Sequence, residues 1–257
     1  MKNNISSPIR VDVVIPVLNE AHVLEKSVAT VREFLKENLS YPWQIMVVDN
    51  GSTDGTYEVA QSLAHRFEDV KFVYLKEKGR GRALREAWQT SAADVVLYTD
   101  VDLSTELKFL PLLVKALAEE GYDMAIGSRL AKDSLTKRSF KREITSRAYN
   151  RFVKWVLFTT FTDAQCGFKA VTREVVDKVV PHVKDQGWFF DTELLVLGEK
   201  QGYKIKDIPV VWVEDDDSRV KIIPTALKNI AGIFRLRWHL TRNGLRKLKI
   251  FRNRGAA

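Results

Sequence analysis

The chain has 257 residues, of which 45% are hydrophobic and 29% charged, and its formal net charge is +8 at pH 7. This length and hydrophobic content suffice for one large domain, or for a domain with an appendage. Cys166 is the only cysteine, which excludes a disulfide framework and favours a reducing compartment, and the longest run without a charged residue, 38–48, is shorter than the ~20 apolar residues of a membrane span.

Short apolar runs rich in β-branched residues alternate with helical patterns through the first half of the chain. Strands are predicted at residues 11–17, 44–48, 71–75, 95–99 and 124–126, with a helix between each pair. This βαβαβαβαβ order predicts an α/β fold with a mostly parallel, twisted sheet and helices on both of its faces.

The pattern changes after residue 129. We predict a basic helix at residues 139–160, a loop at 163–169, a helix after that loop and a further segment at 188–200. A strand at 205–213 precedes an acidic run. The last helix has apolar residues at helical spacing with basic residues between them: Leu227, Ile230, Phe234 and Trp238.

Polar clusters follow all five strands of the first half, and ligands of such sheets bind beyond the carboxyl ends of the strands. These clusters contain Asn19, Glu20, Asp49, Asp54, Gly79, Asp100, Asp102 and Arg129. Two carboxylates, Asp100 and Asp102, suit Mg²⁺ or Mn²⁺, which would neutralise a diphosphate leaving group. The alternative is that Asp100 and Asp102 are acidic residues of a solvated loop, since so short a motif also occurs without a metal. A dinucleotide-binding turn at residues 79–84 is the alternative, but it lacks the third glycine and two βα units precede it.

Several motifs occur in the order found in family-2 glycosyltransferases with the GT-A fold, which the chain resembles over about residues 10–240. They are residues 16–20 (PVLNE), 49–56 (DNGSTDGT), 78–83 (KGRGRA), 100–102 (DVD) and 127–129 (GSR). In the second half, Arg142 with Ser146 and Asn150, the sequence DAQCGFK at 163–169 and WFFDTEL at 188–194 resemble the dolichyl- or polyprenyl-phosphate hexosyltransferase branch. The DAQCGFK form is more similar to the dolichyl-phosphate β-glucosyltransferases than to the mannosyl enzymes.

The resemblance implies roles for individual residues. The metal would be bound by Asp100 and Asp102, although related mannosyl enzymes have Gln where this chain has Ser104. Phosphates would be held by Arg129 and Arg142, whose guanidinium groups suit them. The sugar or the metal would face Asp163 and Asp191, which complete the catalytic set with Asp102, Arg129 and Arg142. The substrate-binding set is Pro16, Asn19, Glu20, Asp49, Ser52, Asp54, Lys78, Gly79, Gly167, Phe168 and Arg219. Simpler readings make Pro16 a turn former, Arg142 a solvated charge and Phe168 a core residue.

The implied reaction is an inverting, metal-dependent transfer of a hexose, glucose from UDP-glucose, to a dolichyl or polyprenyl phosphate. A lipid monophosphate is ionised at neutral pH, since its second pKa lies near ~6, and needs no strong general base. One alternative is a GT-A enzyme with a soluble saccharide acceptor and Asp191 as base. Another is GDP-mannose as donor to the same lipid, and a third is a non-enzymatic protein that retains the pocket.

The positive charge is concentrated at residues 129–154 and 219–257, which together carry +18 and leave about −10 for the rest. This suits phosphates, anionic lipid or nucleic acid, but no nucleic-acid recognition motif is present and we expect no such partner.

We divide the chain into a GT-A catalytic domain, 1–218, and a basic amphipathic segment, 219–257. The catalytic domain has a nucleotide-sugar half at about 10–130 and an acceptor half at about 131–218. With no signal peptide predicted, we expect a peripheral protein on the cytoplasmic face of a membrane. Apolar packing of these helices within the protein is the alternative.

Overall fold

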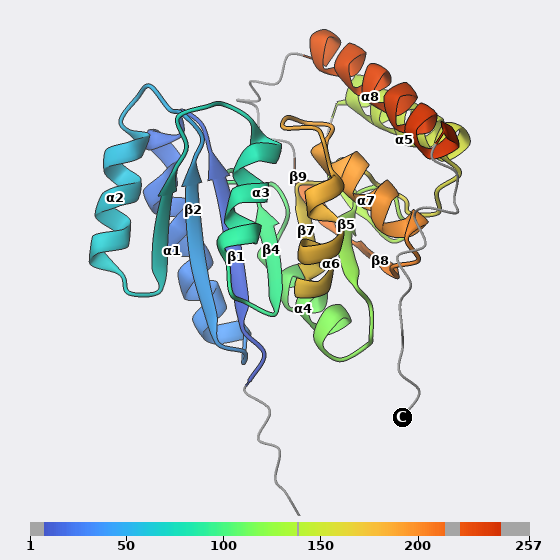
Figure 1. Ribbon diagram of the computed structural model, residues 1–257. Helices are drawn as coiled ribbons and strands as arrows, with labels where there is room; N and C mark the ends of the chain where they lie inside the picture. Colours follow the sequence, from blue (N-terminus) through green and yellow to red (C-terminus); the bar gives the residue numbers. More distant parts are fainter. Residues whose placement is uncertain (1–7, 138, 214–221, 243–257) are drawn as a thin grey trace, which may run out of the picture.

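A seven-stranded sheet forms the centre of the protein in the computed structural model, which describes residues 8–137, 139–213 and 222–242 (Figure 1). The strand order is β3-β2-β1-β4-β7-β5-β8, and only β7 runs antiparallel to its neighbours. The strands are β1 (Val11–Val17), β2 (Trp43–Asp49), β3 (Val70–Tyr74), β4 (Val95–Thr99), β5 (Met124–Ser128), β7 (Phe168–Thr172) and β8 (Ile205–Pro209). The mostly parallel sheet predicted from the sequence is therefore confirmed.

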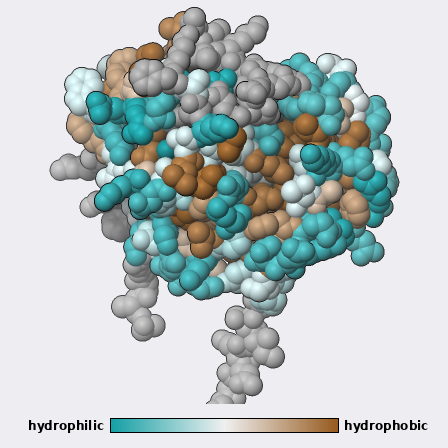
Figure 2. Space-filling model, turned by 180° about the vertical axis from the view of Figure 1, so that it is seen from behind, coloured by the Kyte–Doolittle hydropathy of each residue, from teal (hydrophilic) through white to brown (hydrophobic). Residues whose placement is uncertain are grey.

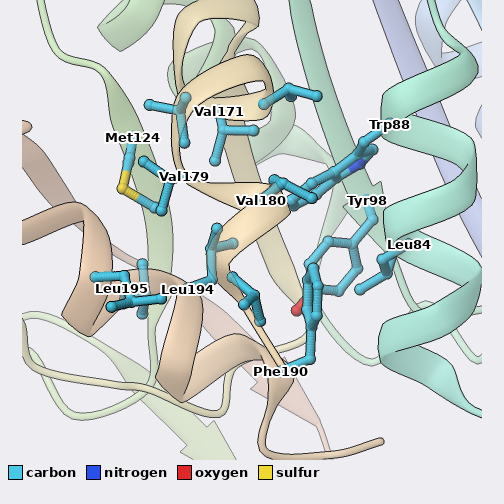
Figure 3. Packing of buried hydrophobic residues seen from close by; sticks show 14 of the residues in the cluster. Leu84, Trp88, Tyr98, Met124, Val171, Val179, Val180, Phe190, Leu194 and Leu195 are labelled. Atoms are coloured by element: carbon cyan, nitrogen blue, oxygen red, sulfur yellow. The ribbon is translucent and has the colours of Figure 1, made fainter. Parts of the chain in front are cut away.

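Helices cover both faces of this sheet, as expected from the β-α alternation. One hydrophobic cluster joins the sheet to α1 (Ala21–Asn38), α2 (Thr56–Arg66) and α4 (Leu110–Ala118). A second cluster, part of which Figure 3 shows, joins the other face to α3 (Arg80–Thr90), α5 (Phe140–Leu157), α6 (Arg173–Lys178), α7 (Phe190–Lys200) and α8 (Ile222–Arg242). Two short 3-10 helices, Leu107–Phe109 and Val180–His182, complete the helical elements described.

Two strands differ from the sequence-based prediction. The last two residues of the loop predicted at 163–169 belong to β7, which lies between β4 and β5. The prediction missed this strand because the charged Lys169, which is buried here, interrupts its apolar run. The strand predicted at 205–213 is divided at Val210 into β8 and β9 (Val211–Val213). While β8 pairs with β5, β9 leaves the sheet to pair with β6 (Leu135–Lys137). Tertiary pairing, which a local pattern does not contain, decides both cases.

Helices α5 and α8 pack on each other outside the sheet (Figure 1), with the rings of Phe152 and Phe234 6.1 Å apart. One face of α8 belongs to the core, because Ile233 and Leu236 are buried there. The described part of the basic C-terminal segment is thus attached to the catalytic domain. No helix within the described residues has both the length and the apolar character that crossing a bilayer requires.

Candidate active site

The loops after β1 and β2 are joined by hydrogen bonds between residues that the sequence motifs single out. Asn19, with a left-handed φ of 59°, donates its backbone N–H to Ser52 Oγ at 2.8 Å, and its side-chain oxygen accepts the N–H of Thr53 at 2.7 Å. The N–H of Glu20 donates to Thr56 Oγ1 at 2.8 Å. Asn19, Glu20 and Ser52 therefore shape one continuous rim beyond the two strands.

The carboxylate of Asp54 holds these same loops together. It accepts the N–H of Thr56 at 3.0 Å and its hydroxyl at 2.5 Å, and the N–H of Ala21 at 3.4 Å. Burial by itself raises the pKa of Asp54, but these hydrogen bonds lower it below its ordinary value overall. The contacts of Asp54 are those of a loop-bracing residue rather than of a group directed at a nucleoside.

Asp49, at the end of β2, has a buried carboxylate oxygen with no hydrogen-bond partner. Its Oδ1 accepts the N–H of Ser52 at 2.9 Å, while its Oδ2 has no partner within the described residues. A buried, unpaired acceptor is rare because it costs free energy unless a ligand or water donates to it. Pro16, half-buried on the neighbouring strand, pairs in register with Val48, one residue before Asp49. This edge therefore offers an acceptor to a donor group of a bound ligand.

Gly79 stands at a close contact between two loops. Its φ is +153°, a Cβ there would lie 2.4 Å from the carbonyl oxygen of Gln186, and its N–H donates to Asn50 Oδ1 at 2.6 Å. A side chain at this position would push the loop before α7 away from the loop before α3. Lys78, the preceding residue, is exposed beside this contact.

The predicted metal ligands follow β4 at the same edge. Asp100 is 41% exposed, and Asp102 is exposed with its Oδ1 accepting the N–H of Ser104 at 3.0 Å. A Cβ on Gly167 would lie 1.7 Å from Asp100 Oδ2, so the absence of a side chain there makes room for this carboxylate. Two accessible carboxylates fit Mg²⁺ or Mn²⁺, which take further ligands from substrate phosphates and water. Within the described ranges, no group of three His, Cys, Asp or Glu residues could hold a metal by itself.

Asp191, the first acidic residue of α7, lies in a buried network of charges. Its carboxylate accepts hydrogen bonds from Tyr98 at 2.5 Å and Arg80 at 2.8 Å, and the ammonium of Lys169 lies 3.3 Å away. The side chains of Asp191 and Lys169 are 3% and 1% exposed. Burial, followed by the charge of Asp191, raises the pKa of Tyr98 well above its ordinary value. Asp191 thus pairs with two cations, Arg80 and Lys169.

Arg80 was not predicted as a site residue. It begins α3, and its second guanidinium nitrogen donates to Asp100 Oδ1 at 2.5 Å, so that it bridges Asp100 and Asp191. The guanidinium also lies 4.9 Å from the ring centre of Tyr98 and 5.0 Å from that of Trp188. The sequence contains one sign of this role. Arg80 is a basic residue between Gly79 and Gly81, in the turn after a predicted strand for which a dinucleotide-binding motif was the alternative.

Asp163 faces Arg129 rather than an open cavity. The fully buried carboxylate receives Arg129 Nε at 2.7 Å and Nη2 at 3.0 Å, together with the backbone N–H groups of Arg129 and Gln165. Burial raises the pKa of Asp163, but Arg129 outweighs it and the pKa falls to about 2. The Arg129 guanidinium lies 5.5 Å from the ring centre of Trp212. Asp163 therefore positions Arg129, the residue that we expect at a phosphate.

The remaining predicted residues fall into three situations. Phe168 is fully buried in the core, in agreement with its simpler reading. Arg142 lies part-buried on α5, whose Asn150 accepts the N–H of Ala164 at 2.8 Å and so fixes the loop that begins at Asp163. Arg219 lies outside the described residues.

The chain is similar in sequence to a known family and to several curated proteins. The model of the family "Glycosyl transferase family 2" matches residues 12–180. The chain is 35% identical over 235 residues to the glycosyltransferase AglD of Haloferax volcanii, covering 91% of this chain but only 38% of AglD. It is 29% identical to the dolichyl-phosphate beta-glucosyltransferase of Dictyostelium discoideum, covering 92% of this chain and 76% of that protein. The enzyme of that name from Saccharomyces cerevisiae is 28% identical, over 84% and 70% of the two chains.

Solved structures show the same fold. Glucosyl-3-phosphoglycerate synthase of Mycobacterium tuberculosis with UDP superposes with a TM-score of 0.69 at 21% identity, over 89% of this chain and 80% of that one. Its complex with Mn²⁺, UDP-glucose and phosphoglyceric acid gives a TM-score of 0.68 at 20% identity, over the same shares. The predicted GT-A fold and the predicted dolichyl-phosphate glucosyltransferase-like branch are both confirmed. With a family match over well over half of its length, this chain is a glycosyltransferase and belongs to glycosyl transferase family 2.

Proposed function

We propose that the protein transfers glucose from UDP-glucose to a dolichyl or polyprenyl phosphate, with inversion at the anomeric carbon and with a divalent metal. The curated relatives named dolichyl-phosphate beta-glucosyltransferase support the acceptor and the sugar. The observation that carries the proposal is that both inner carboxylates of the site, Asp163 and Asp191, are already paired with cations. A general base must be able to accept a proton within hydrogen-bond reach of the acceptor.

The donor side rests on Asp49 and on the pair Asp100 and Asp102. A uracil ring presents one N–H, which is the donor that the unpaired Asp49 Oδ2 lacks. Asp49 ends β2, and the two exposed carboxylates follow β4; β1 lies between these strands in the sheet. A nucleoside diphosphate bound at Asp49 by its base could therefore extend past β1 to Asp100 and Asp102. Bound there by Asp100 and Asp102, Mg²⁺ or Mn²⁺ would supply electrostatic stabilisation of the leaving diphosphate.

The acceptor side follows from the pairing of the inner carboxylates. A sugar hydroxyl needs a base to remove its proton, whereas a phosphate monoester arrives as an anion and needs a cation to position it. Asp163 holds Arg129 by two charged hydrogen bonds, which fix the guanidinium in one orientation. Asp191 as the base of a soluble-saccharide enzyme is disfavoured, because its carboxylate oxygens already accept hydrogen bonds from Tyr98 and Arg80 and lie beside Lys169.

The membrane surface is proposed as the place of action, on the cytoplasmic face. The outer sides of α5 and α8 expose four aromatic residues with exposures of 56–74%: Trp155, Phe158, Phe234 and Trp238. In Figure 2 this region lies at the upper left, where hydrophobic and hydrophilic side chains adjoin. Aromatic and basic side chains on one surface suit the interface of an anionic bilayer. Arg235 belongs elsewhere, since it pairs with buried Glu193 at 2.9 Å.

The test uses radiolabelled UDP-glucose and GDP-mannose against a short polyprenyl phosphate and a soluble glucoside. We expect transfer only from UDP-glucose to the lipid phosphate, and its loss on chelation with recovery on adding Mn²⁺ or Mg²⁺. The variant Asp102→Asn should lose at least about a hundredfold in turnover with an unchanged fold, as loss of a metal ligand predicts. Transfer that persists in chelator would refute the metal, and transfer to the glucoside alone would refute the acceptor.

A further inference from the structure

Arg80 connects the predicted metal ligand Asp100 to the buried Asp191. Its two terminal nitrogens donate to different carboxylates, one to Asp191 and one to Asp100, while its side chain is only 10% exposed. The two carboxylates differ in their other partners. Asp191 also pairs with Lys169, whereas Asp100 is 41% exposed and, among the described residues, has Arg80 as the one cation at ion-pair distance.

The surroundings of Arg80 hold it in this position without a ligand. The rings of Tyr98 and Trp188 lie within 5.0 Å of the guanidinium, and the phenol of Tyr98 is itself bonded to Asp191. Figure 3 shows Tyr98 beside Leu84 and Phe190, between α3 and α7, where the packing fixes its ring. An arginine guanidinium keeps its proton in proteins, so Arg80 stays charged here.

A metal ion that binds Asp100 must come close to this guanidinium. Asp100 Oδ1 is already 2.5 Å from Arg80, and two cations repel strongly in a partly buried site. Bound phosphates change this balance, because they offer the guanidinium charged oxygen acceptors and offer the metal further oxygen ligands.

We propose that Arg80 is a positioning residue that occupies Asp100 in the donor-free enzyme and competes there with the divalent metal, so that the metal binds firmly only together with the nucleoside diphosphate. This inference rests on the proposed function. Once the donor is bound, the guanidinium keeps its bond to Asp191 and turns its other nitrogen from Asp100 to a phosphate oxygen. The coupling favours loading of metal and donor as a pair.

The test measures Mn²⁺ binding by electron paramagnetic resonance, with and without UDP. In Arg80→Met the competing cation is absent, so Mn²⁺ alone should bind about tenfold or more tightly than to the wild type, as the loss of one charged hydrogen bond predicts. The gain in Mn²⁺ affinity on adding UDP should shrink by a similar factor, and kcat should fall. Arg80→Lys keeps the charge but cannot bridge both carboxylates, so its Mn²⁺ affinity should lie between that of the wild type and that of Arg80→Met.

The matched control is Arg82→Met, which removes a cation two residues along α3 that pairs with the exposed Glu77 at 2.7 Å. It should leave Mn²⁺ binding within about twofold of the wild type, because exposed charge is screened. Unchanged Mn²⁺ affinity in folded Arg80→Met, with normal wild-type binding in the presence of UDP, would refute the competition alone. Wild-type enzyme that binds no Mn²⁺ even with UDP would refute the proposed metal dependence and this inference with it. Should Arg80→Met not fold, Arg80→Lys decides the matter by the same comparison.

Discussion

Replacing Asp163 by Asn should destabilise the protein strongly, because the carboxylate is buried and all its partners are donors. Oδ1 accepts from Arg129 Nη2 and the N–H of Gln165, and Oδ2 accepts from Arg129 Nε and N–H. An amide can keep one pair of these bonds but turns an NH₂ toward the other. A pKa of about 2, against the ordinary value of 3.8, corresponds to about 2 kcal/mol of stability above pH 4. Leaving Arg129 unpaired adds to this, and buried pairs that lose one partner cost about 3–5 kcal/mol.

The assay is urea unfolding of wild type and Asp163→Asn from pH 7 down to pH 3. We expect about 3 kcal/mol less free energy of unfolding for the variant at pH 7. Because the folded-state pKa of Asp163 is depressed, its contribution is complete above pH 4 and is lost as the pH falls toward 2. The difference between the proteins should therefore narrow in acid. The control Glu25→Gln, which breaks an exposed pair with Arg66, should cost under about 1 kcal/mol. A loss below about 1 kcal/mol for Asp163→Asn, or a loss independent of pH, would show that this pair does not hold the loop.

Three further outcomes can be measured directly. Gly167→Ala should reduce transfer at least about a hundredfold at little cost in thermal stability, since its Cβ would lie 1.7 Å from Asp100 Oδ2; near-normal transfer would mean that Asp100 moves freely. Asp49→Asn should weaken UDP binding about tenfold and reduce the preference for UDP over ADP in calorimetry, and an unchanged preference would place the base elsewhere. The double variant Trp155→Ser, Trp238→Ser should sediment less with anionic vesicles while keeping its UDP affinity; wild type that remains in the supernatant with anionic and neutral vesicles alike would exclude membrane binding.

Much of the architecture could be predicted from local patterns. The strands at residues 11–17 and 95–99 have the predicted bounds, and the helices cover both faces as the β-α alternation requires. The order of the motifs likewise placed Asp49 and Asp100 at the carboxyl ends of β2 and β4, the two strands that flank β1, because parallel strands bring these ends to one edge. The short strand β7 could not be predicted in this way, since its Lys169 becomes tolerable only beside Asp191.

The sequence by itself determined the α/β class, the family and the chemical types gathered at one edge of the sheet, since these depend on periodicity and on residues close together along the chain. Only the tertiary structure decided which charges meet. Arg80 reaches Asp191 across 111 positions, and Asp163 turns to Arg129 across 34. A carboxylate in a motif can bind substrate, bind metal or hold a cation, and the choice depends on burial and on partners from distant elements. For this reason Asp163 and Asp191 hold cations, while Asp100 and Asp102 remain accessible at the mouth of the site.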